Sequence, residues 1–303
     1  MYRYRPLKEY LMERFGCKVH RVSLDARLTC PNRDGTKGRG GCAFCNCSTL
    51  IPPREGAVPT IREQLLLGME AAKKRRKAEK FIAYFQPNSN TYAPADHLEK
   101  LYREASGHTD IVALAVSTRP DCLNEEVWSL LESFSRKLPL WLELGLQSAH
   151  DSTLTALNRG HGVVDFEAAL HEAAARDIPV CAHVILGLPG ESKADMVATA
   201  RFLARHDIWG VKLHPLHIQK GTRLVEEYRA GSLRVLDVDE YAECVVAFLE
   251  ELPPHTIIHR LSGSTPEQYL IAPSWGSDRF SPPERIRQLL IKQNTRQGRR
   301  YTP

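Results

Sequence analysis

The sequence predicts an α/β protein whose core is a partial (β/α)6 barrel of parallel strands. Six short apolar segments recur along the chain, and segments with apolar residues at helical spacing separate them. Alternation of strands and helices produces parallel strands joined by right-handed crossovers. Six such units fit an open, TIM-like half-barrel better than a doubly wound sheet, and the pattern alone does not separate these two arrangements.

The predicted strands are bounded by polar, glycine-rich or proline-rich segments. They cover residues 19–26, 81–87, 111–118, 140–148, 179–189 and 210–218. Helical periodicity predicts helices over residues 60–77, 96–106, 124–135, 151–158, 165–176, 192–206 and 237–252. Thr60 is a candidate N-cap for the first of these helices because its hydroxyl can accept a hydrogen bond from the first helical turn.

The chain contains no internal repeat and no low-complexity linker, so we expect one main domain within its 303 residues. We assign residues 1–18 to an N-terminal segment and residues 19–218 to the core. Residues 219–291 form a C-terminal extension that packs on the core, and residues 292–303 form a basic tail.

The composition indicates a cytoplasmic protein. No apolar segment follows the first five residues, as a signal peptide requires, and no run of 18 apolar residues suggests a membrane span. The net charge of +5 permits a polyanionic partner without requiring one. The basic excess gathers at Arg3 and Arg5, at residues 73–77 and at residues 292–300. Residues 73–77 are interpreted as a solvated last helical turn.

A cysteine-rich loop follows the first predicted strand. Cys30, Cys42 and Cys45 lie close together in it, among glycines that let the backbone fold back on itself. Three thiolates can hold a four-iron cluster while leaving one iron open to a substrate or cofactor. The alternative is a structural zinc site with Cys47 as fourth ligand, although zinc sites of this kind usually need a second C-x-x-C pair.

Every predicted strand ends in a polar or glycine-rich segment. In parallel α/β folds ligands bind at the carboxyl ends of the strands, so these segments should converge on one mouth. They are the cysteine loop and residues 86–92, 117–121, 145–148, 187–190 and 214–217.

The order of several motifs resembles the radical S-adenosylmethionine (SAM) superfamily, and more closely the bacterial iron–sulfur oxidoreductases related to the catalytic subunit of Elongator. The resemblance spans residues 19–275. The motifs are Cys30…Cys42-x-x-Cys45 with Phe44 in the aromatic position, and residues 118–121, 143–148, 158–161, 183–190 and 212–222. No acetyltransferase domain follows residue 303, so we expect none of the acetyl-CoA chemistry of Elongator here.

The resemblance implies two cofactors. Cys30, Cys42 and Cys45 would hold a [4Fe-4S] cluster, and SAM would chelate its open iron and be cleaved to methionine and a 5′-deoxyadenosyl radical. Gln147 and Arg159 would contact SAM. The other candidate cofactor-binding residues are Phe44, Gln86, Ser117, Glu143, Gly187, Gly190, Lys212 and His214.

One family feature is missing from the second strand. The usual glycine–glycine–glutamate is replaced by Phe85-Gln86-Pro87, so the group that receives the SAM amino group is not evident.

Three side-chain placements stay open. Glu143 either faces the barrel interior or is a core carboxylate neutralised by an arginine or by Lys212. His214 and His217 cannot both face the interior if their strand is regular. Arg119 and Asp121 either form the rim of the mouth or pair with each other in a turn.

The sequence supports three functional hypotheses. The first is a radical SAM enzyme that modifies RNA, at the 5-substituent of a tRNA wobble uridine. It would bind tRNA through the basic N- and C-terminal segments and take electrons from a donor such as flavodoxin or ferredoxin. The second is a radical SAM oxidoreductase for a small molecule, similar to porphyrin-precursor decarboxylases. The third is a non-catalytic metal protein that binds RNA. The tail is either an RNA contact or a disordered terminus.

Overall fold

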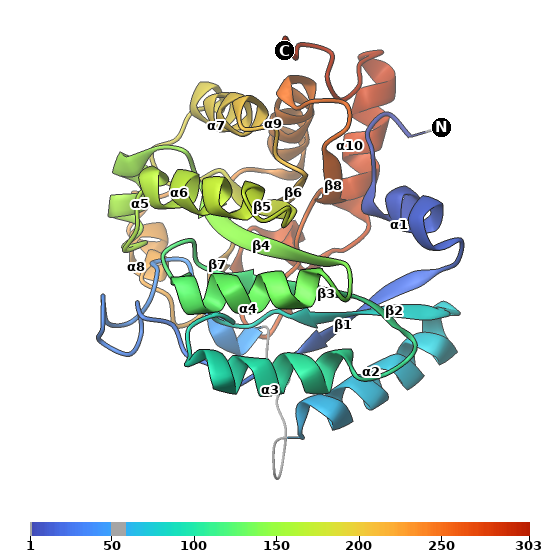
Figure 1. Ribbon diagram of the computed structural model, residues 1–303. Helices are drawn as coiled ribbons and strands as arrows, with labels where there is room; N and C mark the ends of the chain where they lie inside the picture. Colours follow the sequence, from blue (N-terminus) through green and yellow to red (C-terminus); the bar gives the residue numbers. More distant parts are fainter. Residues whose placement is uncertain (1, 50–58) are drawn as a thin grey trace.

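The structure is a computed structural model that describes residues 2–49 and 59–303. Its centre is a single curved sheet of parallel strands, which confirms the predicted fold class (Figure 1). In spatial order the strands are β1 (Val19–Leu24), β2 (Lys80–Phe85), β3 (Ile111–Thr118), β4 (Leu140–Gln147), β5 (Val180–Leu186), β6 (Gly210–Pro215) and β8 (Ile257–Arg260). The described part of the chain therefore adds a seventh strand, β8, which the sequence analysis missed.

Helices cover the outer face of the sheet, as the strand–helix alternation predicts. They are α2 (Ile61–Arg76), α3 (Ala95–Ser106), α4 (Glu125–Ser135), α6 (Val163–Ala174), α7 (Lys193–Arg205) and α9 (Val238–Glu251), with α10 (Ser281–Lys292) packed on α9. Two shorter helices, α5 (Asp151–Ala156) and α8 (Leu224–Arg229), lie at the carboxyl end of the sheet. Thr60 caps α2 in a capping box with Glu63, which confirms the predicted N-cap.

The main core lies between the sheet and this helical layer. Phe81, Phe85, Leu114 and Leu142 are fully buried there against apolar side chains of the helices. The strands read as continuous apolar runs because helices cover one face and the barrel interior encloses the other.

A helix that the sequence analysis missed, α1 (Leu7–Phe15), closes the amino end of the half-barrel. Its Leu7 and Leu11 pack against Ile82, Trp141 and Ile257, which face the barrel interior. The preceding residue, Pro6, pairs with Ile258 of β8.

The two ends of the chain lie side by side (Figure 1). Gln297 donates from its backbone to the Arg3 carbonyl at 2.9 Å, and its side chain donates to the carbonyls of Pro253 and Thr256. Arg300 forms an ion pair with Glu250 at 2.9 Å. The tail is thus ordered, and because Thr256 directly precedes β8, it lies at the amino end of the sheet.

Two further strands, β7 (Ile218–Gln219) and β9 (Leu270–Ala272), form a separate antiparallel pair. Among the described helices, none has both the length and the apolar character needed to cross a membrane.

Candidate active site

The cysteine loop runs from the end of β1 across the carboxyl end of the sheet. Its turns are closed by backbone hydrogen bonds from Arg33 to the Cys30 carbonyl, at 2.8 Å, and from Cys45 to the Cys42 carbonyl, at 2.9 Å. Positive φ angles of 80° at Gly40 and Gly41 reverse the chain just before Cys42. All three candidate ligand cysteines are free thiols.

Arginine side chains surround these thiols. Arg159 Nη1 lies 3.4 Å from Cys42 Sγ, and Arg33 Nη2 donates to the Cys45 carbonyl at 2.7 Å. A hydrogen bond from Cys47 and the charge of Arg33 lower the pKa of Cys45 to about 6. Cys45 is therefore a thiolate at neutral pH, the form that binds metal.

Cys47 behaves differently from its neighbour. Its sulfur lies 3.6 Å from Cys45 Sγ and donates to Asn88 Oδ1 at 3.0 Å. The hydrogen bond with Cys45 and burial raise the pKa of Cys47, so it remains a protonated thiol. Within residues 2–49 and 59–303, no three His, Cys, Asp or Glu side chains converge as the ligands of a single metal ion, and this holds for Cys30, Cys42 and Cys45 as well as for a set that includes Cys47.

Arg119 and Asp121 pair with each other, the second of the two alternatives for them. Their side chains are almost fully buried and share two hydrogen bonds, of 2.8 and 2.9 Å. The pair also fixes its surroundings, because Asp121 accepts from Lys37 of the cysteine loop at 2.6 Å and Arg119 donates to the Arg159 carbonyl at 2.8 Å.

Arg159 reaches the cysteine loop across a glycine of β4. Its Nη2 donates to the Gly145 carbonyl at 2.8 Å, and a Cβ at Gly145 would lie only 2.5 Å from that nitrogen. A side chain at this position would therefore displace the Arg159 guanidinium from its bond to the Gly145 carbonyl. The Arg159 Nε is buried and has no partner among the described residues, so one donor of the guanidinium is available to a ligand.

A cavity of about 230 Å³ opens at the carboxyl ends of the strands. It brings together seven of the predicted site residues: Phe44, Cys45, Gln86, Ser117, Gln147, Lys212 and His214. The side chains of Gln147 and His214 form no hydrogen bond with any described residue and are therefore available to a ligand.

Glu143 lies in the barrel interior and is fully buried. Its Oε2 accepts hydrogen bonds from Tyr84 at 2.6 Å and from Lys212 at 2.6 Å, and lies 2.7 Å from His183 Nε2. Arg21 approaches its other oxygen at 3.5 Å. Both alternatives for Glu143 therefore hold: it faces the interior, and Lys212 neutralises it.

The charges of Glu143, Lys212 and His183 follow from their burial and from their pairing with one another. Burial opposes ionisation of Glu143, but Lys212 and the His183 hydrogen bond outweigh it and hold its pKa well below the usual range. Burial lowers the pKa of Lys212 to about 8 and that of His183 to about 4. At neutral pH Glu143 is thus a carboxylate, Lys212 an ammonium group and His183 a neutral imidazole.

Comparison with known proteins identifies this arrangement. The family model of the radical SAM superfamily matches residues 34–203, more than half of the chain, and that of the radical SAM C-terminal domain matches residues 208–292. Protein YhcC of Escherichia coli strain K12 is 39% identical over 272 residues, which cover 89% of this chain and 87% of that protein. The chain belongs to the radical SAM superfamily.

Two relatives link this radical SAM protein to Elongator. Elongator complex protein 3 of Homo sapiens is 27% identical over 164 residues, which cover 52% of this chain and 29% of that protein. The archaeal Elp3 of Methanocaldococcus infernus has the same fold, with a TM-score of 0.73 at 17% identity, over 93% of this chain and 64% of that one. This chain thus spans less than two thirds of the archaeal structure and less than a third of the human protein.

As a radical SAM protein, the chain uses a [4Fe-4S] cluster and SAM, and its residues fit both. Cys30, Cys42 and Cys45 are the candidate cluster ligands, and the surrounding arginines offset the negative charge of three thiolates. When bound, the cluster supplies the electron that cleaves SAM to a carbon radical. Arg159, whose Nη1 lies beside Cys42 Sγ and whose Nε has no partner among the described residues, is suited to a carboxylate such as that of SAM.

Other predicted residues of the radical SAM site lie outside the cavity lining. Arg159 is buried next to the cavity, and Glu143 lies beneath Lys212. Gly187 and Gly190 have positive φ angles of 83° and 78°, and a Cβ at Gly187 would lie 2.9 Å from Leu236. Gly187 therefore lets the chain after β5 turn closely over the C-terminal extension. The predicted role of Gly187 in binding the cofactor stays a prediction.

Nine polar residues that line the cavity are absent from the predicted site residues: Asn46, Thr49, Tyr84, His183, His217, Gln219, Arg260, Ser264 and Thr265. His217 lines it together with His214 because β6 ends at Pro215, so strict alternation ends before His217. His217 Nδ1 lies 2.8 Å from Thr265 Oγ1 of the C-terminal extension. In the sequence, Pro215 is the signal for this end, because a proline cannot continue a central strand and the alternation of faces therefore stops there.

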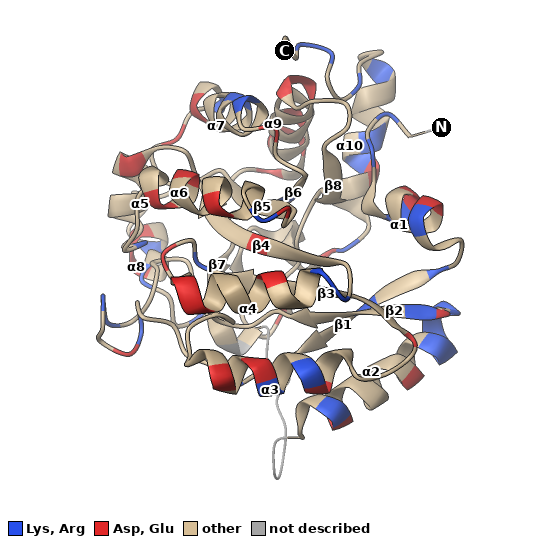
Figure 2. Cartoon of the chain, viewed as in Figure 1, with Lys and Arg blue, Asp and Glu red and all other residues tan. Residues whose placement is uncertain are grey.

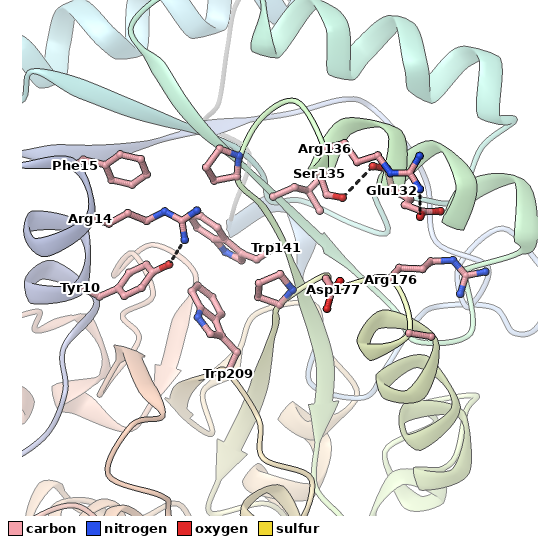
Figure 3. Close-up of a pocket in the computed structure, with 14 residues that line it drawn as sticks. Tyr10, Arg14, Phe15, Glu132, Ser135, Arg136, Trp141, Arg176, Asp177 and Trp209 are labelled. Atoms are coloured by element: carbon pink, nitrogen blue, oxygen red, sulfur yellow. Dashed lines mark hydrogen bonds and ion pairs between the residues drawn. The ribbon is translucent and has the colours of Figure 1, made fainter.

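A second cavity, of about 470 Å³, lies at the opposite end of this radical SAM barrel (Figure 3). Tyr10 and Arg14 of α1 and Trp141 and Trp209, at the amino ends of β4 and β6, line it. Its other arginines, Arg136 and Arg176, already pair with glutamates. We place the active site at the carboxyl-end cavity because the cysteines and the unpaired polar groups lie there.

Proposed function

We propose that this radical SAM enzyme acts on RNA, at the substituent on the 5-position of a tRNA wobble uridine. The observation that carries the proposal is the similarity to Elongator complex protein 3 over about half of the chain. We further propose that a small electron-transfer protein, flavodoxin or ferredoxin, reduces the cluster.

The size of the cavity limits what can enter it. A volume of about 230 Å³ accommodates a nucleobase with its substituent and excludes a base-paired duplex. A substrate RNA must therefore present an unstacked nucleotide, as single-stranded loops do. An anticodon loop meets this requirement.

Exposed cations beside the mouth support RNA binding. Arg39 of the cysteine loop is exposed and, with Arg223, lines a small depression directly over Cys42 and Cys45. Lys220, also exposed, lies in the adjoining turn before α8. We refer to Arg39, Lys220 and Arg223 as the mouth cations. Their position suits contacts to the phosphates that flank a nucleotide in the cavity.

The basic termini lie at the end of the sheet opposite to the mouth of the cavity. Lysines and arginines gather around both chain ends and on α10 (Figure 2). Gln297 anchors this region next to Thr256, at the amino end of β8. An RNA that bound both the termini and the mouth would have to span the length of the barrel. We therefore propose the mouth cations as the main RNA contacts.

Lys212 is the candidate proton-transfer residue of the cavity. Its Nζ donates to Tyr84 at 2.8 Å and to Glu143 at 2.6 Å, and it lines the cavity. With its pKa lowered to about 8 by burial, Lys212 can give up and regain a proton near neutral pH.

The test is mass spectrometry of tRNA nucleosides from a strain that lacks the gene. We expect one wobble-uridine derivative to disappear and its precursor to accumulate, with recovery when the wild-type gene is supplied. A Cys42→Ala gene, which removes a candidate cluster ligand, should fail to restore the derivative. An unchanged nucleoside profile would refute the RNA proposal and favour a small-molecule substrate.

A further inference from the structure

Arg260 is an arginine of the cavity wall that has no partner. It is the last residue of β8, stands beside Lys212 in the sheet register and lines the cavity. Its side chain forms no hydrogen bond or ion pair with any residue in 2–49 or 59–303. The other arginines of this end are engaged: Arg119 by Asp121, Arg159 by the Gly145 carbonyl and Arg21 by Glu143.

The charges that face Arg260 do not balance. Three cations point into the barrel interior, Arg21 from β1, Lys212 from β6 and Arg260 itself, and they face the single carboxylate of Glu143. Apart from Cys45, whose thiolate is a candidate cluster ligand, the other titratable groups of this space are neutral at pH 7, because burial raises the pKa of Tyr84 and Cys181 and lowers that of His183, His214, His217 and His259. Lys212 is buried and the two arginines are partly buried, and an excess of positive charge in such a site is unfavourable unless an anion compensates it.

The surroundings of Arg260 provide further donors for an anion. Ser264 and Thr265 follow it in the chain and line the same cavity, and His214 is also without a hydrogen-bond partner among the described residues. The chain passes close over His214, since a Cβ at Gly263 would lie 2.5 Å from His214 Nδ1. The guanidinium fork fits the two oxygens of a carboxylate or phosphate in a bidentate geometry.

We propose that Arg260 binds an oxyanion of the substrate, a carboxylate or a phosphate, and so fixes the substrate against Lys212 and the cluster end of the cavity. The inference rests on the proposed function only in taking this cavity as the substrate site; it does not require that the substrate is RNA. SAM has a carboxylate as well, but Arg159 lies beside Cys42, whereas Arg260 belongs to the edge strand β8.

The experiment measures anion binding to the cluster-reconstituted protein by calorimetry and thermal unfolding, at constant ionic strength set with chloride. The probes are inorganic phosphate and acetate. In the wild type we expect saturable binding in the millimolar range and a rise in melting temperature. Arg260→Gln should weaken binding by roughly tenfold or more, and Arg260→Lys should weaken it less, because one charge remains without the fork.

Arg14→Gln is the matched control. Arg14 is exposed at the opposite end of the barrel, so this variant removes the same charge without touching the cavity. It should bind both anions like the wild type. Arg260→Gln should unfold at the wild-type temperature or above it when no anion is present, since it removes a partly buried charge that has no counterion, and this result shows that the variant is folded.

The two probes and SAM distinguish the sources of the oxyanion. Stronger binding of phosphate than of acetate indicates a phosphate group, and the reverse indicates a carboxylate. The proposal is overturned if the wild type binds neither probe up to about 100 mM. The proposal is also overturned if Arg260→Gln binds phosphate and acetate as tightly as the wild type does. It is overturned as well if Arg260→Gln loses affinity for SAM rather than for these two anions. None of these results depends on the tRNA nucleoside profile, so the two proposals can fail separately.

Discussion

The two ends of the half-barrel are built from the same strands but serve opposite purposes. At the amino end, α1 covers the strands with Leu7 and Leu11, and in the cavity there Arg136 and Arg176 pair with glutamates, while the buried Trp141 Nε1 has no partner among the described residues. At the carboxyl end, Gln147, His214 and Arg260 line a cavity without hydrogen-bond partners among the described residues. The amino end pairs most of its charged groups internally, and the carboxyl end leaves several polar groups for ligands.

This difference shows that cavity size is a poor guide to the site. The amino-end cavity is the larger, about 470 Å³ against about 230 Å³. What distinguishes the smaller cavity is a set of charged and polar groups with unusual pKa values that share one space with the cysteines. Each prediction below changes one end and uses the other end, or a neighbouring residue, as its control.

The largest effect is expected at the cysteines. Replacing Cys30, Cys42 or Cys45 by Ala should abolish cluster assembly and the formation of 5′-deoxyadenosine from SAM. Cys47→Ala should retain both, because Cys47 is a protonated thiol bonded to Asn88. The measurements are iron content per chain and chromatography of the SAM cleavage products. An equal loss in all four variants would show that the ligand set is wrong.

The second prediction concerns the buried charge of Glu143. Glu143→Gln leaves Lys212 and Arg21 without their counterion, and we expect a loss of about 4 kcal/mol in the free energy of unfolding, measured with denaturant. The control is Glu132→Gln at the amino-end cavity, where the ion pair with Arg136 is partly exposed. That variant should change stability by less than about 1 kcal/mol. If Glu143→Gln and Glu132→Gln lost similar amounts of unfolding free energy, the difference in burial between the two carboxylates would not explain stability.

The third prediction compares two aspartates at opposite ends of β3. The hydrogen bonds from Arg119 and Lys37 outweigh burial and lower the pKa of Asp121 to about 2, and those from Lys73 and Lys80 lower that of Asp110 to about 2. A lowered carboxyl pKa stabilises the fold above the unfolded value, near 4, so this contribution is lost as the pH falls from about 4 to about 2.

Burial separates these two aspartates. Asp121→Asn leaves the buried Arg119 unpaired and should cost about 3 kcal/mol at pH 7, with little dependence on salt. Asp110→Asn should cost less than about 1 kcal/mol, and added salt should remove the difference, because its partners are exposed. Both variants should lose part of the acid-induced destabilisation between pH 4 and 2. If added salt changed the stability loss of Asp121→Asn as much as that of Asp110→Asn, the Arg119–Asp121 pair would not be shielded from solvent as its burial implies.

The smallest effect is expected in RNA affinity. The double variant Arg39→Gln, Lys220→Gln at the mouth should weaken binding of an anticodon stem-loop and lower the slope of log K against log salt by about 1 to 2. The matched double variant Arg296→Gln, Arg299→Gln removes the same charge from the tail. If the tail variant weakens binding and the mouth variant does not, RNA contacts the termini, as the sequence suggested.

Much of this architecture was predictable because its signals are local. The apolar strand segments, the helical periodicity and the cysteine spacing each lie within a few residues of one another, and the sheet of parallel strands follows from their order. Convergence of the polar strand ends then brought seven predicted residues to one cavity. The rule that ligands bind at the carboxyl ends of parallel strands placed six of these residues there, and Lys212 came from the resemblance to the radical SAM superfamily.

What the sequence could not show depends on distant contacts. β8 has four residues, of which His259 and Arg260 are polar, so it carries no strand pattern and forms only because β6 has a free edge. Because β8 was not predicted, Arg260 was not predicted to line the site either. The basic composition of the tail suggested an RNA contact or disorder; the bonds of Gln297 and Arg300 to partners more than 40 residues away in the chain contradict disorder, and the RNA contact stays a prediction.

The bonds between the cysteine loop and the sheet have a consequence for cluster assembly. Lys37 is held by Asp121, Asn32 donates to the Asn158 carbonyl, and the Ala43 backbone donates to the Leu157 carbonyl, and none of these bonds uses a thiol. Ordering a flexible loop costs about 1 to 2 kcal/mol per residue in backbone entropy, and these bonds offset part of that cost independently of the cluster. Iron loss in air should therefore be a ligand-exchange event rather than a collapse of the fold, and the apoprotein should accept a new cluster without refolding.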